Sequence, residues 1–271
     1  MQLKGKVIIV TGAANGIGKA MVQRFHAEQP EKIVMVDVDE SGLRALAAEY
    51  DNCTAFVADM GSESDVSRLI RETEAAFGRI DLYCGNAGIF RMGGADTSNE
   101  DFQKVWDINV QSHIYAARAA LPKMLERGEG YFLITASAAG MLTQLGSLSY
   151  SMSKHAALSF AEWIAVSHGH QGIKVSALCP QAVESNMTAG TDGSVAGVDG
   201  MLPAADVAEC VVNTLDAEEF LVLPHPNVKK YFQNKANDYD RWIGGMQKLQ
   251  QQFSQLSPEN VETGAGIGGK S

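Results

Sequence analysis

Residues 6–18 of this chain read KVIIVTGAANGIG, an apolar run that passes through a glycine-rich turn into an amphipathic segment. The run VIIV is continuously apolar, as expected of a parallel strand covered on both faces. Glycines let the backbone turn tightly and approach a diphosphate, whose charge is then met by the N-terminus of the next helix. The spacing is GxxxGxG rather than GxGxxG, but strand, turn and helix follow in the order that a nucleotide site needs.

Outward from this stretch, short apolar runs alternate with longer helical patterns. We expect strands at Lys6–Thr11, Ile33–Asp37, Thr54–Ala58, Asp81–Cys84, Gly130–Ala136, Ile173–Cys179 and Phe220–Leu223. We expect helices at Gly16–Glu28, Ser64–Phe77, Asn99–Glu126, Tyr150–Ser167 and Ala204–Leu215, and a last one at Val228–Phe253 that Gly244 and Gly245 weaken near its middle. The alternation predicts an α/β fold, a Rossmann-like doubly wound parallel sheet of about seven strands with helices on both faces.

The composition fits one domain over residues 1–256, followed by a tail at 257–271 whose composition is typical of disorder. The net charge of -10 lacks the clustered Lys and Arg that phosphate backbones require, so nucleic acid is not an expected partner. No apolar run approaches the ~20 residues of a membrane span, and a strand begins too early for a signal peptide. We therefore expect a cytoplasmic protein.

The four cysteines form neither a CxxC pair nor a Cys/His cluster, so no metal site is expected. Cys53, Cys84 and Cys179 lie at or beside predicted strands, which suits reduced, buried thiols.

The second strand ends near Asp37, 25 residues after Gly12. A carboxylate there can accept hydrogen bonds from adenosine ribose hydroxyls and would repel a 2′-phosphate. The positions where a basic residue would welcome that phosphate hold Asn15 and Val38. NAD is therefore predicted over NADP, the alternative being that Asp37 is a solvated residue that opens a loop.

A second group of residues suggests proton transfer. Ser137 follows the run GYFLITA, Tyr150 comes 13 residues later, and Lys154 lies four residues beyond it. Positions i and i+4 share a helix face, so the ammonium can approach the phenol. A nearby cation favours an ionised phenol, and this would bring the tyrosine pKa from ~10 toward a range useful for acid/base chemistry.

Together these motifs resemble those of the short-chain dehydrogenase/reductase family, over roughly Lys6 to Leu223. The match rests on TGAANGIG at 11–18, Asn86-Ala87-Gly88, Asn109, Ser137, Tyr150 with Lys154, and the segment Pro180 to Ser185. The resemblance implies a catalytic set of Asn109, Ser137, Tyr150 and Lys154. It also implies a cofactor site made by Gly12, Asn15, Gly16, Ile17, Gly18, Asp37, Asp59, Met60, Asn86, Ala87, Gly88, Tyr150, Lys154, Pro180, Val183 and Ser185.

The family supplies a role for each group. Ser137 would hydrogen-bond the substrate oxygen and Tyr150 would exchange its proton. Lys154 would lower the tyrosine pKa and hold the nicotinamide ribose, and Asn109 would position a water that relays protons. Val183 and Ser185 would meet the nicotinamide carboxamide. Two departures are visible: Gln181 stands where the family usually has Gly, and Ser185 where it usually has Thr, which keeps the hydroxyl.

The expected substrate pocket is mostly apolar, which suits a lipophilic alcohol or ketone such as a steroid, an aryl alcohol or an alicyclic alcohol. Its residues are Phe90, Arg91, Met92, Ala138, Ala139, Met141, Leu142, Leu145 and Met187. Arg91 either pairs with a substrate carboxylate or is an exposed loop residue. Of the histidines, His155, His168 and His170 are expected to be structural or solvated, and His225 either faces substrate or is structural.

The predicted function is NAD-dependent hydride transfer between a secondary alcohol and a ketone. The alternative from another class is a catalytically silent nucleotide-binding scaffold, which would be expected to lack one of the four catalytic residues. Enoyl reduction is disfavoured by the four-residue Tyr–Lys spacing, and dehalogenation by Lys154 itself. A homodimer or homotetramer is expected, joined through the Asn99–Arg127 region. The glycine-rich loop Met187–Met201 is expected to act as a mobile lid.

Overall fold

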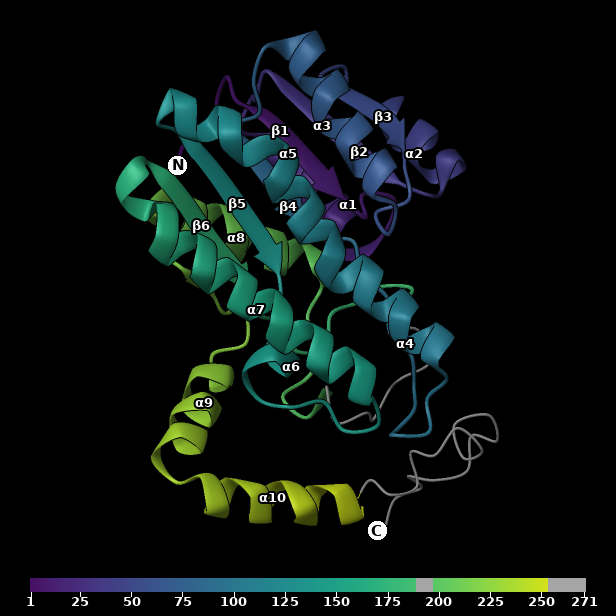
Figure 1. The fold of residues 1–271 in the computed structure, drawn as a ribbon, viewed down its shortest axis with the longest axis vertical. Helices are drawn as coiled ribbons and strands as arrows, with labels where there is room; N and C mark the ends of the chain where they lie inside the picture. Colours follow the sequence, from purple (N-terminus) through teal and green to yellow (C-terminus); the bar gives the residue numbers. More distant parts are fainter. Residues whose placement is uncertain (189–196, 253–271) are drawn as a thin grey trace.

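The computed structural model describes residues 1–188 and 197–252 (Figure 1). Most of the loop Met187–Met201 and the whole of the tail at 257–271 lie outside the described residues. The lid and the disordered tail therefore stay predictions.

Within the described residues, seven parallel strands form one sheet in the order β3-β2-β1-β4-β5-β6-β7. The strands are β1 (Val7–Thr11), β2 (Lys32–Asp37), β3 (Cys53–Val57), β4 (Leu82–Gly85), β5 (Gly130–Thr135), β6 (Ile173–Leu178) and β7 (Leu221–Val222). The winding reverses between β1 and β4, and ligands bind outside the carboxyl ends of the strands at such a switch point. The Rossmann-like doubly wound fold is confirmed.

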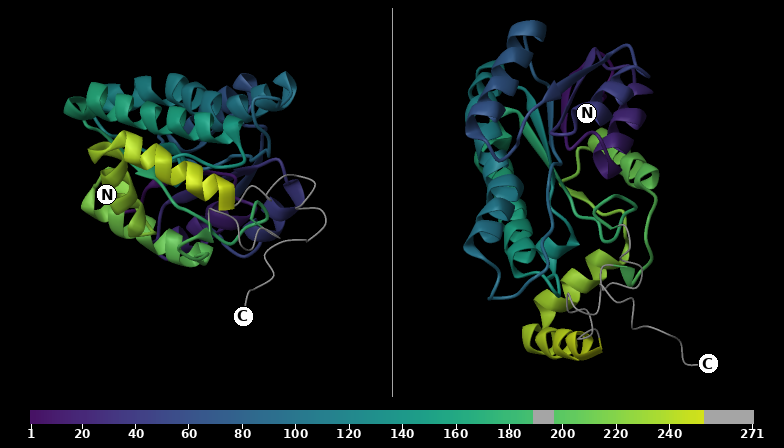
Figure 2. Two further views of the ribbon diagram at one scale, coloured as in Figure 1. Left: turned by 90° about the horizontal axis from the view of Figure 1, so that it is seen from below. Right: turned by 90° about the vertical axis from the view of Figure 1, so that its right-hand side faces the viewer.

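Helices cover both faces of the sheet (Figure 2). On one face lie α3 (Glu63–Phe77), α5 (Ser112–Arg127) and α7 (Leu148–His168), and on the other α1 (Gly16–His26), α2 (Glu40–Ala47) and α8 (Ala204–Ala217). The side chains of β1 alternate between these two cores: Ile9 packs with the first layer, and Ile8 and Val10 with the second. All three are fully buried, and each buried side chain of this size contributes roughly 1.5–3 kcal/mol.

The predicted helix Asn99–Glu126 is divided into three parts. It begins as α4 (Asn99–Trp106), widens into a π-helical turn at Asp107–Gln111, and continues as α5. A π-turn inserts an extra residue into a helix and is frequent at functional sites. Here it carries Asn109, which is fully buried.

The prediction of one helix at Val228–Phe253 is wrong. The chain forms α9 (Asn227–Asn237) and α10 (Tyr239–Gln252), which lie beyond the end of the sheet (Figure 1). The break falls at Asp238, whose backbone is extended and whose Oδ1 accepts a hydrogen bond from the Arg241 amide at 2.9 Å. Such a side chain caps the start of a new helix. The glycine pair lies inside α10, where its low helix propensity does not break the helix.

Cys53, Cys84 and Cys179 are buried free thiols, as expected, and Cys210 is a partly buried one. Among the helices of residues 1–188 and 197–252, none combines the length and apolar character that crossing a bilayer requires.

Candidate active site and nucleotide site

The glycine-rich turn between β1 and α1 forms a cradle that has no room for side chains. A Cβ at Gly12 would lie 3.0 Å from the Ala87 Cα, and one at Gly16 would lie 2.8 Å from the Ser185 Cβ. A Cβ at Gly18 would overlap the Gly12 carbonyl oxygen. Gly12 and Gly16 also have positive φ values of 65° and 52°, which only glycine adopts readily. The turn therefore fits closely against two segments that are distant in sequence, one around Ala87 and one around Ser185.

Thr11 and Asn86 join this turn to the end of β4. The Thr11 hydroxyl accepts hydrogen bonds from the amides of Asn86 (2.9 Å) and Ala87 (3.0 Å). The Asn86 side chain donates to the Thr11 carbonyl at 3.0 Å and accepts from the Thr135 hydroxyl at 3.2 Å. These bonds fix the segment from Asn86 to Gly88 beside the turn. Thr11 and Thr135 were not predicted as site residues.

The N-terminus of α1 keeps its own amides available. Asn15 stands at the N-cap position, but its side chain makes no capping hydrogen bond and instead accepts one from the Asn186 amide at 3.0 Å. The first amides of an α-helix have no partner within the helix and favour an anion. This terminus and the cradle fit the diphosphate of a dinucleotide.

Asp37 lies next to the cradle. Its carboxylate accepts hydrogen bonds from the amides of Ala14 (3.0 Å), Val38 (2.8 Å) and Asp39 (3.2 Å). The carboxylate is therefore held at the end of β2, beside the turn. Val38 is 68% exposed, so the neighbouring position is open to solvent.

The two residues expected at the adenine differ in exposure. Asp59 is exposed, and its Oδ1 accepts a hydrogen bond from the Gly61 amide at 2.8 Å. The Met60 side chain is buried in the core, which leaves its backbone as the part that could meet a base.

Ser137 begins the catalytic set with a strained backbone. It follows β5 and has a φ of 119°, a conformation that non-glycine residues rarely adopt and that costs on the order of 1–3 kcal/mol. Its hydroxyl donates to the Pro180 carbonyl at 3.3 Å and accepts from the Ala139 amide at 3.1 Å, at the start of α6 (Ala138–Met141). These hydrogen bonds hold Ser137 in its strained backbone conformation, and this conformation places the Ser137 hydroxyl at the end of the sheet.

Tyr150 and Lys154 lie one turn apart on α7, as their spacing predicts. The Lys154 Nζ lies 5.5 Å from the centre of the Tyr150 ring and donates a hydrogen bond to the Thr135 carbonyl at 2.9 Å. Lys154 is only 3% exposed. Phe90 packs edge-on against Tyr150, with ring centres 5.1 Å apart.

The pKa values of this pair differ from the expectation. Desolvation raises the pKa of the Tyr150 phenol, and the Ser137 hydroxyl acts in the opposite direction. Burial lowers the pKa of Lys154 to about 8. The ammonium lies over the ring face and donates to a carbonyl, so the predicted lowering of the tyrosine pKa by Lys154 is not found. Near neutral pH the phenol therefore keeps its proton, which suits a general acid.

Asn109 connects the remaining elements of the site. Its Oδ1 accepts from the Ile89 amide at 2.8 Å, and its Nδ2 donates to the Ile89 carbonyl and the Ser153 hydroxyl, both at 3.0 Å. A Cβ added at Gly88 would lie 3.3 Å from both the Asn109 Oδ1 and the Lys154 Nζ. The structure thus brings all four predicted catalytic residues to one end of the sheet, next to the cradle.

His113 is a buried residue that the sequence analysis missed. It is 1% exposed, and neither ring nitrogen has a hydrogen-bond partner among the described residues. Burial lowers its pKa to about 3, and the charge of Lys154 acts in the same direction. No sequence signal separates it from the other inward-facing positions of α5. The ring stays neutral and places no second charge near Lys154.

Arg91 and His225, two further candidates for contact with substrate, each have a partner within the protein. Arg91 forms an ion pair with Asp101 at 3.5 Å, so the guanidinium is at least partly engaged within the protein. His225 is 3% exposed, and its Nδ1 accepts from the Gln181 amide at 3.2 Å. The ring is thus buried and bonded to the backbone of the segment that follows Pro180.

Comparisons with known proteins agree with this geometry. The sequence profile of the short chain dehydrogenase family matches residues 6–194. The chain is 34% identical over 252 residues to 1-deoxy-11-beta-hydroxypentalenate dehydrogenase from Streptomyces exfoliatus, covering 90% of this chain and 91% of that protein. It is 32% identical over 195 residues to 3beta-hydroxysteroid dehydrogenase 2 from Eggerthella lenta, covering 69% and 75%.

A solved structure is similar over most of the chain. It is a short chain dehydrogenase/reductase from Burkholderia phymatum in complex with NAD, with a TM-score of 0.80 and 26% sequence identity. The superposition covers 89% of this chain and 96% of that one.

Proposed function

The chain belongs to the short-chain dehydrogenase family, and from this membership we propose that it is an NAD-dependent oxidoreductase that interconverts a secondary alcohol and a ketone. The observation that carries the proposal is the position of Asn109, Ser137, Tyr150 and Lys154 beside a glycine cradle. A silent scaffold has no need of an intact catalytic set. The test is a panel of secondary alcohols scored by NADH absorbance, in which no turnover of any member would contradict the proposal.

Bound NAD would supply the group that accepts or donates hydride. The amides of α1 and the cradle would hold its diphosphate, and the segment from Pro180 to Ser185 would hold its nicotinamide end. Ser137 and Tyr150 would hydrogen-bond the substrate oxygen, where negative charge develops during reaction. Tyr150 would give its proton to that oxygen in reduction and take it back in oxidation. Lys154 would restore the tyrosine proton, since its lowered pKa makes it a ready donor.

We propose a lipophilic, ring-containing substrate. The Phe90 ring packs on Tyr150, and the residues just after Ser137 include the apolar Ala138, Ala139, Met141 and Leu142, all of which are buried. By their names, two relatives act on a hydroxypentalenate and a 3beta-hydroxysteroid. The panel should therefore include polycyclic alcohols beside small aliphatic ones, with the higher kcat/KM expected for the polycyclic alcohols.

NAD should be used at least ~100-fold more efficiently than NADP, because the Asp37 carboxylate would repel a 2′-phosphate. Exchanging Asp37 for Ser and Val38 for Arg should narrow or reverse this preference. The measurement is kcat/KM for both cofactors with one alcohol. Asp39→Ser is the matched control, since it removes an exposed carboxylate two residues away. Equal efficiencies in the unmodified enzyme would contradict the assignment of Asp37.

We also propose a cytoplasmic homodimer or homotetramer that uses the face made by α5 and α7. An apolar groove on this face is lined by Ile114, Ala117, Arg118, Leu121, Pro122, Leu125, Phe160, Trp163 and Ile164. Trp163, in this groove, is 61% exposed, and Val166 on the same helix is 82% exposed. A contiguous exposed apolar patch of this kind marks an interaction surface.

Trp163→Glu should convert the oligomer to monomers, because it places a charge in the centre of the apolar contact. Light scattering coupled to size exclusion measures the mass directly. Tyr239→Glu, on an exposed position of α10, is the control and should leave the mass unchanged. A monomeric unmodified protein would contradict the proposed interface.

A further inference from the structure

A polar network lies next to the segment from Pro180 to Ser185, and His225 is its buried member. Gln181 is the residue that replaces the family's usual glycine. Its backbone amide donates a hydrogen bond to the His225 Nδ1 at 3.2 Å. His225 is 3% exposed and lies between β7 and α9. The Nδ1 accepts this bond, so the neutral ring carries its hydrogen on Nε2. A segment that would face the cofactor is thus held from behind by one imidazole.

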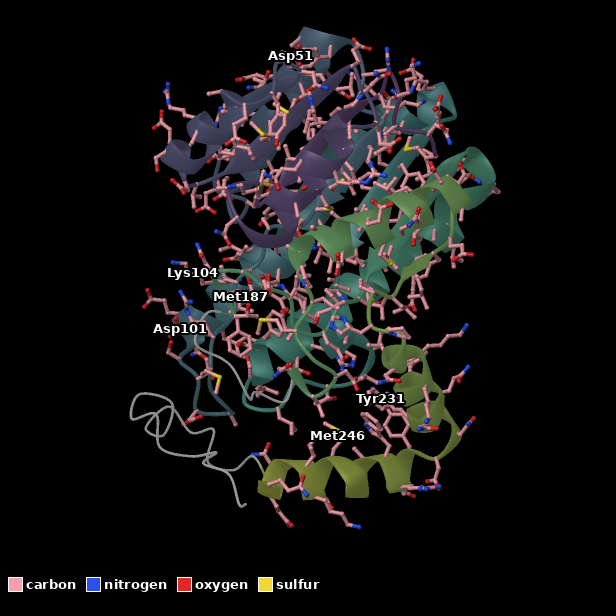
Figure 3. The ribbon with its side chains drawn as sticks, turned by 180° about the vertical axis from the view of Figure 1, so that it is seen from behind. Asp51, Asp101, Lys104, Met187, Tyr231 and Met246 are labelled. Atoms are coloured by element: carbon pink, nitrogen blue, oxygen red, sulfur yellow. The ribbon has the colours of Figure 1, made fainter. Side chains whose placement is uncertain are left out.

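The charge of Asp199 acts on His225, and Asp199 in turn contacts α9. Its Oδ1 accepts from the Asn227 side chain at 2.9 Å and from the Tyr231 hydroxyl at 3.0 Å. Tyr231 projects from α9 (Figure 3). Burial acts to raise the pKa of Asp199, but the hydrogen bonds from Asn227 and Tyr231 help to lower it overall. Asp199 therefore stays charged.

Three atoms of this network have no hydrogen-bond partner among the described residues: the His225 Nε2, the Asp199 Oδ2 and the Gln181 Oε1. They are one donor and two acceptors. Replacing His225 with an apolar residue would also leave the Gln181 backbone amide without its acceptor.

Backbone bonds couple the same region to the cofactor segment. Glu184 donates to the Leu202 carbonyl at 3.0 Å, and Leu202 donates to the Ala182 carbonyl at 3.1 Å. Leu202 thus lies directly against the stretch from Ala182 to Glu184. Gln181, whose backbone amide bonds to His225, immediately precedes this contact.

We propose that His225 is a positioning residue that sets the backbone of Gln181 to Ser185 for the nicotinamide end of the cofactor. This rests on the proposed function for the identity of the cofactor. The hydrogen bond from the Gln181 backbone amide to the His225 Nδ1 does not depend on the proposed function, and it can be tested in the protein without cofactor.

His225→Leu removes the acceptor, so amide hydrogen exchange of residues 181–185 should become at least tenfold faster in the protein without cofactor. The dissociation constant of NADH, followed by its fluorescence, should rise about tenfold, with KM for NAD rising more than kcat falls. His225→Asn places an amide oxygen near the Nδ1 position. It should therefore bring both the exchange rate and the NADH affinity most of the way back to those of the unmodified protein. His170→Leu, at an exposed histidine, is the control and should change neither.

Faster exchange with unchanged NADH affinity would overturn the positioning role, and so would unchanged exchange. If the enzyme turned over no alcohol but exchange and NADH binding changed as expected, the proposed reaction would fail and the role of His225 would stand. Should His225→Leu fail to fold, the nitrogen shifts of labelled histidine in the unmodified protein decide the matter. An Nε2–H tautomer supports the proposal, and an Nδ1–H tautomer or a charged ring at neutral pH overturns it.

Discussion

Tyr150→Phe should lower kcat by roughly 10²–10⁴-fold, the usual contribution of a positioned general acid or base. The change removes one hydroxyl and leaves the ring, so the packing against Phe90 is kept. NADH affinity should change less than threefold, because the phenolic proton serves the substrate oxygen. Steady-state kinetics and NADH fluorescence measure the two effects separately.

Tyr239→Phe is the matched control for this change. It removes the same atom from an exposed position on α10 and should leave kcat as it is. If Tyr150→Phe kept more than a few per cent of the activity, the phenol would not be the acid/base group.

Lys154→Met should also lower turnover by about 100-fold or more, because this lysine would restore the tyrosine proton. It should weaken NADH binding about tenfold, because the family resemblance implies that the lysine holds the nicotinamide ribose. The same substitution should not lower the stability of the fold. The pKa of Lys154 falls from 10.5 to about 8 through burial, so the unfolded chain binds this proton more tightly than the folded one. The charged lysine therefore opposes folding at neutral pH.

The thermal midpoint of Lys154→Met at pH 7 should consequently equal or exceed that of the unmodified protein. The unmodified protein should gain stability from this residue as the pH rises from about 8 to about 10.5, and the variant should lack that gain. Calorimetry across this pH range measures both, with Lys104→Met as an exposed control. A lower midpoint for Lys154→Met would show that the lysine's hydrogen bond to Thr135 outweighs its burial, and unchanged NADH affinity would remove the ribose contact.

The sequence was most informative where function depends on local spacing. The glycine turn, the individual strands and helices, and the i and i+4 relation of Tyr150 and Lys154 each depend on a short stretch of chain. Each therefore has a periodicity or a spacing that can be recognised without knowledge of the fold.

One feature that escaped prediction is local: the pattern of Val228–Phe253 has helical periodicity throughout, and the Asp238 cap marks the break between α9 and α10. The others depend on contacts between distant segments. The bond between Gln181 and His225 joins residues 44 positions apart. The tyrosine pKa was predicted in the wrong direction because spacing gives proximity, whereas desolvation and the direction of the Lys154 ammonium arise from the whole site.

The closure of the glycine turn by Ser185 and Asn186 has a consequence for biosynthesis. Asn15 and its partner Asn186 are separated by 171 positions, so the ribosome makes the turn long before it makes the residues that complete it. At translation speeds of about 5–20 residues per second, the interval is roughly 10–35 s. Throughout that interval the cradle lacks its contacts with Ser185 and Asn186. A bound dinucleotide would therefore stabilise the completed fold, through mass action, more than the emerging N-terminal half.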